Sequence, residues 1–185
     1  MQQEKLIAEV KTLMDLVANK TTSMADSTMT INVNEYTNPD QFEREKLELF
    51  RNYAQFVGPS CIVPNPGDYF SFDDTGVPIL ITRTQDGSLN AFVNICSHRG
   101  APLTDCDHGQ AKKGKMFSCP YHGWSYNLEG DLIGVPFGNE GFPDLKREEL
   151  GLKKLQVEEK YGMIFVMPNP ELSFDIDEVL GGINE

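Results

Sequence analysis

Two short stretches decide the fold of this chain, and they read Cys96-Ser97-His98-Arg99-Gly100 and Cys119-Pro120-Tyr121-His122-Gly123-Trp124. Each follows directly on an apolar run that is typical of a β-strand, residues 91–95 in one case and 116–118 in the other. Each brings one thiol and one imidazole to a loop. The sequence therefore predicts a metal centre with two cysteine and two histidine ligands, which are Cys96, His98, Cys119 and His122.

The division of these side chains between two loops narrows the kind of metal centre. Two thiolates and two imidazoles form the donor set of a Rieske-type [2Fe–2S] cluster, in which the cysteines hold one iron and the histidines the other. Neutral imidazoles leave less negative charge on the cluster than thiolates would, so it accepts an electron more readily. Zinc is the alternative, because it binds the same donors. Zinc sites more often pair cysteine with cysteine and histidine with histidine, so the mixed loops favour the cluster.

Another Cys-x-His pair, Cys106 and His108, lies between the two stretches and is a second candidate for the first ligand pair. Residues 104–108 are acidic and lack a preceding apolar strand, so we expect Cys106 and His108 on a solvated loop. Cys61 is expected to begin a strand and to be buried as a small hydrophobic residue.

Four neighbouring residues are expected to surround the cluster, namely Arg99, Gly100, Gly123 and Trp124. The two glycines fall where the backbone has to pass close to the cluster. N–H groups at these positions are expected to donate to its sulfide. The imidazoles are expected near the surface, where an electron-transfer partner must reach them.

Length and composition limit the classes of function that fit. The 185 residues suffice for one domain with a hydrophobic core. No apolar run approaches the roughly 20 residues of a membrane span. The N-terminus lacks the pattern of a secretory signal, so we expect no membrane partner and a cytoplasmic location. The net charge of −12 argues against nucleic acid and fits a protein partner of complementary charge.

Two helices are expected before the strands, separated by a linker over residues 20–34. Residues 4–18 carry apolar side chains at helical spacing. A second helix is expected from Asn38 to about Val57. Its core-facing residues would be Phe42, Leu47, Phe50, Tyr53 and Ala54. Both apolar faces are interpreted as packing surfaces, and a subunit contact by the first helix is the alternative.

From Cys61 onward the pattern changes to short strands. These are expected at residues 61–63, 68–72, 78–83, 89–94, 115–118, 124–127, 131–134, 154–158 and 162–166. Asp86-Gly87 and Glu129-Gly130 predict tight hairpin turns. Many short strands at close spacing predict a mainly β fold, an antiparallel β-sandwich or small barrel with two cluster-binding loops, preceded by one or two N-terminal helices. Residues 175–180 look like the start of another helix.

The chain resembles the Rieske domain of ring-hydroxylating (Rieske non-haem iron) oxygenase α-subunits. Beyond the cluster stretches, motifs in family order are Phe42-Glu-Arg-Glu-Lys, Val57-Gly58, Pro66-Gly67-Asp68-Tyr69, Gly130-Asp-Leu-Ile-Gly-Val-Pro136 and Tyr161-Gly-Met-Ile-Phe-Val166. The resemblance implies an N-terminal helix and linker (residues 1–37), a Rieske [2Fe–2S] domain (38–170) and a tail (171–185) that leads toward a catalytic domain absent from this sequence.

An electron-transfer role is what this resemblance implies. Electrons would arrive from a ferredoxin or reductase and leave through His98 and His122 for a mononuclear iron in a catalytic domain or subunit, with a homotrimer as the implied assembly and Trp124 shielding the cluster. Family α-subunits bind that iron through two histidines and a carboxylate, but this chain has only 3 histidines. No complete catalytic site is therefore expected. The alternatives are a free-standing Rieske carrier and a zinc-stabilised binding module.

Two departures from respiratory Rieske proteins bear on the redox potential. Those proteins carry a disulfide between the cluster loops, where this chain has Ala101 and Tyr121. They also carry a hydroxyl where this chain has Trp124. Fewer hydrogen-bond donors stabilise the reduced cluster less, so we expect a potential in the low part of the Rieske range.

Overall fold

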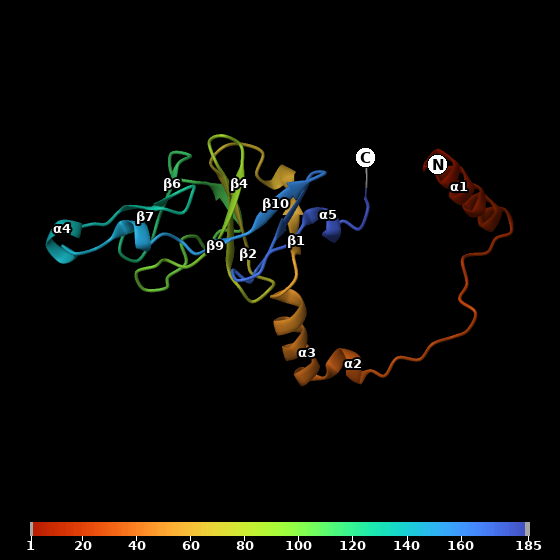
Figure 1. Ribbon diagram of the computed structural model, residues 1–185. Coiled ribbons are helices and arrows are strands. Elements are labelled where there is room, and N and C mark those ends of the chain that lie inside the picture. The colour runs from red at the N-terminus through yellow and green to blue at the C-terminus, as the bar shows by residue number, and fades with distance from the viewer. Residues whose placement is uncertain (1, 184–185) are drawn as a thin grey trace. The chain divides into compact units, whose positions relative to one another are not determined.

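The computed structural model describes residues 2–183 and falls into two units, residues 1–38 and residues 39–185. The first unit holds the long helix α1 (Gln2–Ala18) and the one-turn helix α2 (Asn34–Thr37), as Figure 1 shows. The helix expected over residues 4–18 is thus present. None of the described side chains in residues 3–38 is buried, so the apolar face of α1 does not serve as a packing surface within its own unit.

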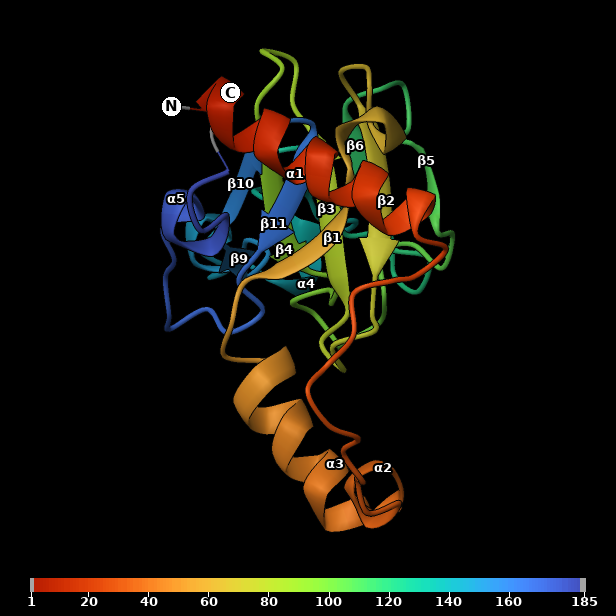
Figure 2. The same ribbon diagram turned by 90° about the vertical axis from the view of Figure 1, so that its right-hand side faces the viewer.

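A helical segment opens the second unit and projects away from the strands (Figure 2). It consists of α3 (Pro39–Glu45) and a π-helical stretch, η1 (Lys46–Phe50). The predicted extent of this helix, to Val57, is wrong. The chain instead enters strand β1 (Gln55–Pro59), because its backbone pairs there with a strand from the far end of the unit. That pairing outweighs the local helical pattern.

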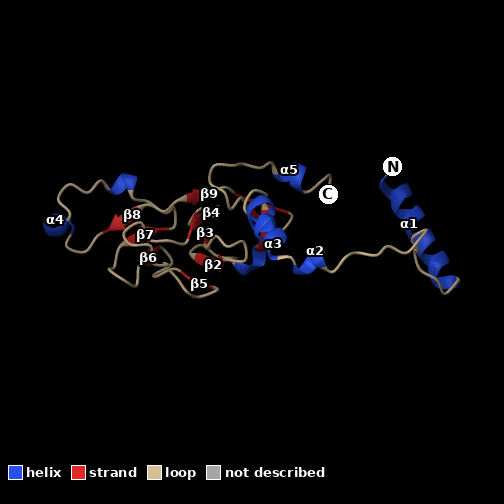
Figure 3. Cartoon of the chain, turned by 90° about the horizontal axis from the view of Figure 1, so that it is seen from below, coloured by secondary structure: helices blue, strands red, loops and turns tan. Residues whose placement is uncertain are grey.

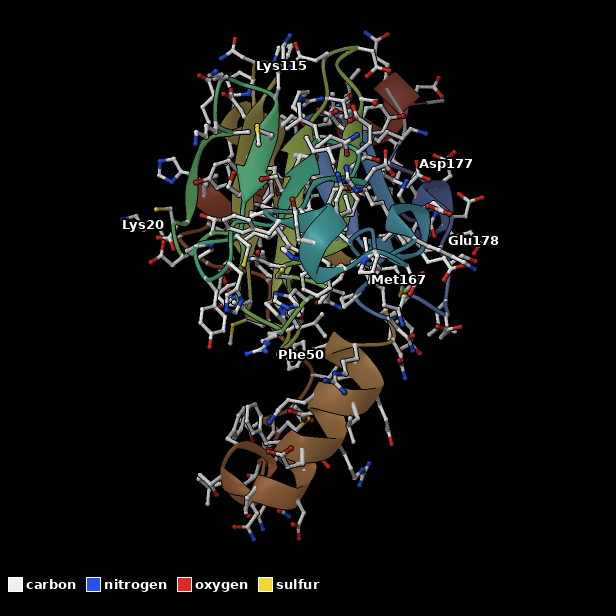
Figure 4. All side chains as sticks on the ribbon, turned by 90° about the vertical axis from the view of Figure 1, so that its left-hand side faces the viewer. Lys20, Phe50, Lys115, Met167, Asp177 and Glu178 are labelled. Carbon is white, nitrogen blue, oxygen red and sulfur yellow. The ribbon has the colours of Figure 1, made fainter. Side chains whose placement is uncertain are left out.

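The side chains of this helical segment were also expected to face a core, and this is wrong for several of them. Phe42 and Tyr53 are more than half exposed, at 54% and 63%. Phe50 lies where the segment joins the sheets (Figure 4) and is also exposed, at 37%. Because the segment projects from the sheets, helical spacing of apolar residues here does not produce burial.

Eleven strands in the described residues form three antiparallel sheets, which confirms the predicted mainly β class. The strand orders are β1-β11-β10, β5-β2-β3-β4-β9 and β6-β7-β8. The remaining strands are β2 (Asp68–Phe72), β3 (Ile79–Arg83), β4 (Leu89–Val93), β5 (His108–Gln110), β6 (Met116–Ser118), β7 (Ser125–Asn127), β8 (Leu132–Gly134), β9 (Lys154–Leu155), β10 (Val157–Lys160) and β11 (Met163–Val166). Figure 3 shows these strands between α4 (Gly138–Gly141) at one end of the unit and α3 at the other.

The central strand β3 is buried along its whole length and separates two hydrophobic cores. Ile79 and Ile81 belong to the core that β1 and β11 complete. Leu80, which points to the opposite face of the sheet, belongs to the core shared with β6 and β7. This second core also contains Cys96 and Cys119. The predicted thiol ligands are therefore held by the packing between two sheets.

Both predicted hairpin turns are present. Gly87 joins β3 to β4 and Gly130 joins β7 to β8, each with a positive φ, of 88° and 84° respectively, which favours glycine. The Asp86 carboxylate accepts hydrogen bonds from Thr84 and Ser88. These bonds lower the pKa of Asp86 to about 2, so the turn keeps its charge at all but strongly acidic pH.

Two short segments differ from the expectation. Residues 60–62 form a 3₁₀ turn, η2 (Ser60–Ile62), not a strand, and Cys61 is exposed where a buried side chain was expected. The expected loop around His108 is partly a strand, because β5 pairs with β2 at the edge of the five-stranded sheet. Cys106 and His108 are exposed, as expected.

The C-terminal part of the described chain returns to the sheets. Helix α5 (Ile176–Val179) begins after Asp175, whose carboxylate caps the N–H of Asp177. An ion pair between Lys160 and Asp177 joins α5 to β10. Of the tail expected over residues 171–185, residues 184–185 lie outside the described residues. Among residues 2–183, no helix combines the length and apolar character of a membrane span.

Candidate metal centre

The four predicted ligands lie on two loops of the same local design, residues 96–101 after β4 and residues 119–124 after β6. In each loop the N–H of the cysteine donates to the carbonyl five residues later, at 2.8 and 2.7 Å. The N–H of the glycine in fifth position donates back to the cysteine carbonyl, at 2.9 and 3.0 Å. The repeated geometry explains why both stretches contain a glycine at that position, since its φ is 74° in one loop and 75° in the other.

The glycine N–H groups are therefore committed to the loops themselves, although donation to the cluster was expected near Gly100 and Gly123. The N–H groups of Tyr121 and His122 instead donate to the sulfur of Cys119. Such N–H···S bonds stabilise negative charge on the sulfur. Donation from the loop backbone to the sulfide of the cluster stays a prediction.

Cys96 and Cys119 form an inner pair of thiols. Their side chains interact with each other and are 2% and 3% exposed. Burial raises the pKa of the Cys119 thiol, and the N–H groups that reach its sulfur act in the opposite direction. Two adjacent buried thiols of this kind are suited to a positively charged iron, which would offset the cost of ionising them.

His98 and His122 form an outer pair of imidazoles. Their ring centroids lie 4.8 Å apart with an interplanar angle of 63°. His98 is half-buried and His122 is exposed. Partial burial, the neighbouring His122 and the positive charge of Arg99 all lower the pKa of His98. The neutral imidazole, which is the form that binds metal, is thereby favoured.

Aromatic rings enclose the imidazole pair. Trp124 is buried and stacks on His98, with ring centroids 4.6 Å apart and an interplanar angle of 6°. On the other side, the Tyr121 ring lies 3.8 Å from that of His122. Phe142, from a distant part of the sequence, meets both His98 and Trp124 edge-on. Trp124 thus lies against a predicted ligand, and its expected shielding of the cluster stays a prediction; Phe142 was not expected at the site.

Tyr126 is a second residue that the sequence analysis missed. Its hydroxyl lies 3.3 Å from Sγ of Cys96 and accepts the N–H of Ser97 at 3.1 Å. The hydroxyl proton is therefore available to a Cys96 thiolate. Burial raises the pKa of Tyr126, which keeps that proton in place. Trp124 directly precedes β7, and Tyr126 lies two residues later in the same core. Because alternate residues of a strand point to the same face, the position of Trp124 could have indicated Tyr126 from the sequence.

The arrangement fits the donor set of a [2Fe–2S] cluster, because the thiols are paired inside and the imidazoles are paired outside. Within residues 2–183, no three His, Cys, Asp or Glu side chains are grouped in the way a single metal ion requires. Cys106 and His108 do not join the four candidates. The Cys106 thiol instead approaches the carboxylate of Asp105, at 3.7 Å.

Comparison with known proteins agrees with this geometry. The family model for the Rieske [2Fe-2S] domain matches residues 54–155. The large oxygenase component of salicylate 5-hydroxylase from Ralstonia sp is 40% identical over 153 residues, which cover 77% of this chain and 34% of that protein. The α-subunit of benzene 1,2-dioxygenase from Pseudomonas putida is 36% identical over 146 residues, covering 79% of this chain and 32% of its own length.

Solved structures show the same relationship. A naphthalene 1,2-dioxygenase superposes with a TM-score of 0.70 at 32% identity, covering 77% of this chain and 31% of its own. A quaternary ammonium Rieske monooxygenase superposes with a TM-score of 0.75 at 30% identity, and the match covers 85% of this chain and 43% of that one. The chain thus spans about a third of the length of the curated relatives it matches. It belongs to the Rieske [2Fe–2S] domain family, in the form that ring-hydroxylating oxygenase α-subunits carry, and its cofactor is a Rieske-type [2Fe–2S] cluster, not zinc.

Proposed function

We propose that this domain relays single electrons, with Cys96 and Cys119 holding the inner iron of the cluster and His98 and His122 the outer one. The observation that carries the proposal is the separation of the donors into a buried thiol pair and a more exposed imidazole pair. When bound, the cluster supplies reversible one-electron transfer. The protein contributes the surroundings of the cluster, because it buries the two thiols and leaves the imidazole edge accessible.

The imidazole edge is the route by which electrons leave the domain under this proposal. His122 is exposed, and the exposed side chains nearby in sequence, Tyr121 and Ile95, are apolar or aromatic. A partner that covers this edge would exclude water and approach the outer iron closely. Arg99 adds a positive charge beside His98, which favours an acidic group on the partner.

The partners follow from the relatives, which are named as large oxygenase components and α-subunits. We infer that a ferredoxin or reductase supplies the electrons and that a mononuclear-iron catalytic domain or subunit accepts them, within a homotrimer. A cytoplasmic location belongs to the same proposal, because Cys61 and Cys106, the two cysteines outside the candidate ligand set, are exposed thiols, which persist in a reducing compartment.

The ligand assignment is tested by three single substitutions in the full chain. His98→Ala and His122→Ala should abolish incorporation of the cluster, because each removes one of two nitrogen ligands from the outer iron. His108→Ala is the matched control and should leave the visible spectrum unchanged, since His108 is exposed on β5. The measurements are iron and sulfide content, about two of each per chain in the parent, and the EPR spectrum after reduction.

The opposite pattern would refute the assignment. A colourless His108→Ala protein together with an intact spectrum in His98→Ala would transfer the ligand role to the second Cys-x-His pair. Electron delivery is tested separately, by mixing the reduced parent, without oxygen, with the catalytic part of a related α-subunit whose mononuclear iron is in the Fe(III) state and can accept one electron. Oxidation of the cluster under those conditions is expected, whereas an inert mixture would favour the free-standing carrier.

A further inference from the structure

A segment outside the cluster loops crosses both of them. This segment, residues 136–151, is called the strap below. At its start, a Cβ placed on Gly123 would lie only 3.1 Å from Cγ of Pro136, so the proline ring lies directly against the second loop. At its end, the carbonyl of Gly151 accepts a hydrogen bond from Oγ of Ser97, at 2.9 Å, in the first loop. One continuous segment therefore contacts both ligand loops.

The strap is anchored independently of the imidazoles. Leu145 and Leu150 pack, partly buried, against the hydrophobic core that contains the thiols. Just beyond the strap, the N–H of Leu152 donates to the carbonyl of Gly130 at 2.8 Å. These contacts hold the strap after Phe142, and the contact of Pro136 with the second loop holds it before Phe142. The backbone between these contacts, which carries Phe142, is therefore held in place.

The ring of Phe142 contacts both His98 and Trp124. Its ring centroid lies 5.8 Å from that of His98 and 5.8 Å from that of Trp124, with an interplanar angle of 87° in both cases. His98 and Trp124 are themselves parallel. Phe142 therefore stands across the edges of a stacked pair. An edge-to-face contact with both rings is favourable and opposes sliding or rotation of the imidazole over the indole.

We propose that Phe142 is a positioning residue for His98, which it holds in place over Trp124 so that the imidazole stays attached to the cluster. The inference rests on the proposed ligand role of His98. It also implies an asymmetry between the two ligands. His98 is held by two rings, whereas His122 has the exposed ring of Tyr121 beside it. Loss of Phe142 should therefore affect the site through His98.

The test compares four proteins as full chains loaded with the cluster: the parent, Phe142→Ala, Phe142→Tyr and Phe137→Ala. Phe137 is the matched control, because it lies on the same strap but is 82% exposed. Phe142 is itself 38% exposed and lies outside both cores, so its truncation should leave the fold intact. The readouts are the rate at which visible absorbance bleaches with an iron chelator, the EPR line shape after reduction, and the midpoint of thermal unfolding.

Phe142→Ala should bleach on the order of 2 to 10 times faster than the parent, the factor expected from losing an aromatic contact. Its EPR lines should broaden, because His98 would sample more than one orientation. Phe142→Tyr retains the ring and should restore the parent rate, and Phe137→Ala should behave like the parent. A merely structural role would lower the unfolding midpoint without changing the EPR line shape.

Two results would overturn the inference. If Phe142→Ala matches the parent in bleaching rate and line shape, Phe142 does not position His98, although the proposed function stands. If Phe142→Ala loses stability with an unaltered line shape, its role is structural only. A parent chain that binds no cluster would instead defeat the proposed function itself, and the two failures are thereby distinguished.

Discussion

At the scale of single residues, the hydroxyl of Tyr126 changes the expectation for the redox potential. The low potential expected from Trp124 rests on the absence of a hydroxyl at that position, and it stays a prediction. Tyr126, however, places a hydroxyl 3.3 Å from the sulfur of Cys96. We expect its proton to stabilise the more negative, reduced cluster. The potential of this domain should then depend both on the hydroxyl missing at Trp124 and on the hydroxyl of Tyr126.

Replacing this hydroxyl gives a direct measurement of its effect. Tyr126→Phe should lower the midpoint potential by roughly 40 mV, if the hydrogen bond favours the reduced state by about 1 kcal/mol. Tyr69→Phe is the control, because it removes a hydrogen bond to Thr104 in the same core. It should reduce stability without moving the potential. Equal potentials in the parent and Tyr126→Phe would show that the hydroxyl does not act on the cluster.

At the scale of elements, the ion pair of Arg83 and Glu159 joins two sheets. Arg83 ends β3 and Glu159 lies on β10, and the guanidinium contacts both carboxylate oxygens, at 2.7 and 3.1 Å. Nε of Arg83 also donates to the carbonyl of Val63. The bond from Arg83 lowers the pKa of Glu159 below its usual 4.5, so folding favours the ionised carboxylate.

The stability that this pair contributes should depend on pH in a defined direction. Because the folded-state pKa of Glu159 is depressed, its contribution is complete above about pH 4.5 and is lost as the pH falls through the folded value. Glu159→Gln should lower the free energy of unfolding by about 1–3 kcal/mol at pH 7, and the difference from the parent should shrink at pH 3.

The surface pair of Lys146 and Glu149 supplies the control for this prediction. Both of these side chains are about two-thirds exposed, so Glu149→Gln should change stability little at either pH. Denaturant unfolding at pH 7 and pH 3 measures the free energy of unfolding of the parent, Glu159→Gln and Glu149→Gln. A parent–variant difference for Glu159→Gln that stays constant from pH 7 to pH 3 would contradict the assigned role.

Elements also show what local sequence can and cannot predict. The two ligand loops and the two hairpin turns depend on residues within a few positions of one another, so their spacing and glycines reveal them. The helix expected to reach Val57 fails because β1 pairs with β11, more than 100 residues away. Strand β5 has three residues at a sheet edge, too few for a pattern. Phe142 meets His98 only after the fold is complete, so no local signal indicates it.

At the scale of the whole molecule, the two units differ in what they contribute. Both hydrophobic cores and all four candidate ligands lie in residues 39–185, whereas none of the described side chains in residues 3–38 is buried. Removal of residues 1–38 should therefore leave the thermal unfolding midpoint and the EPR spectrum of the cluster unchanged, because the truncated chain keeps both hydrophobic cores and all four candidate ligands. A truncated chain that loses the cluster or unfolds at a clearly lower temperature would contradict this prediction. An unchanged midpoint together with a change in oligomeric state would instead assign that face to contacts between subunits, the alternative that the helical pattern of α1 leaves open.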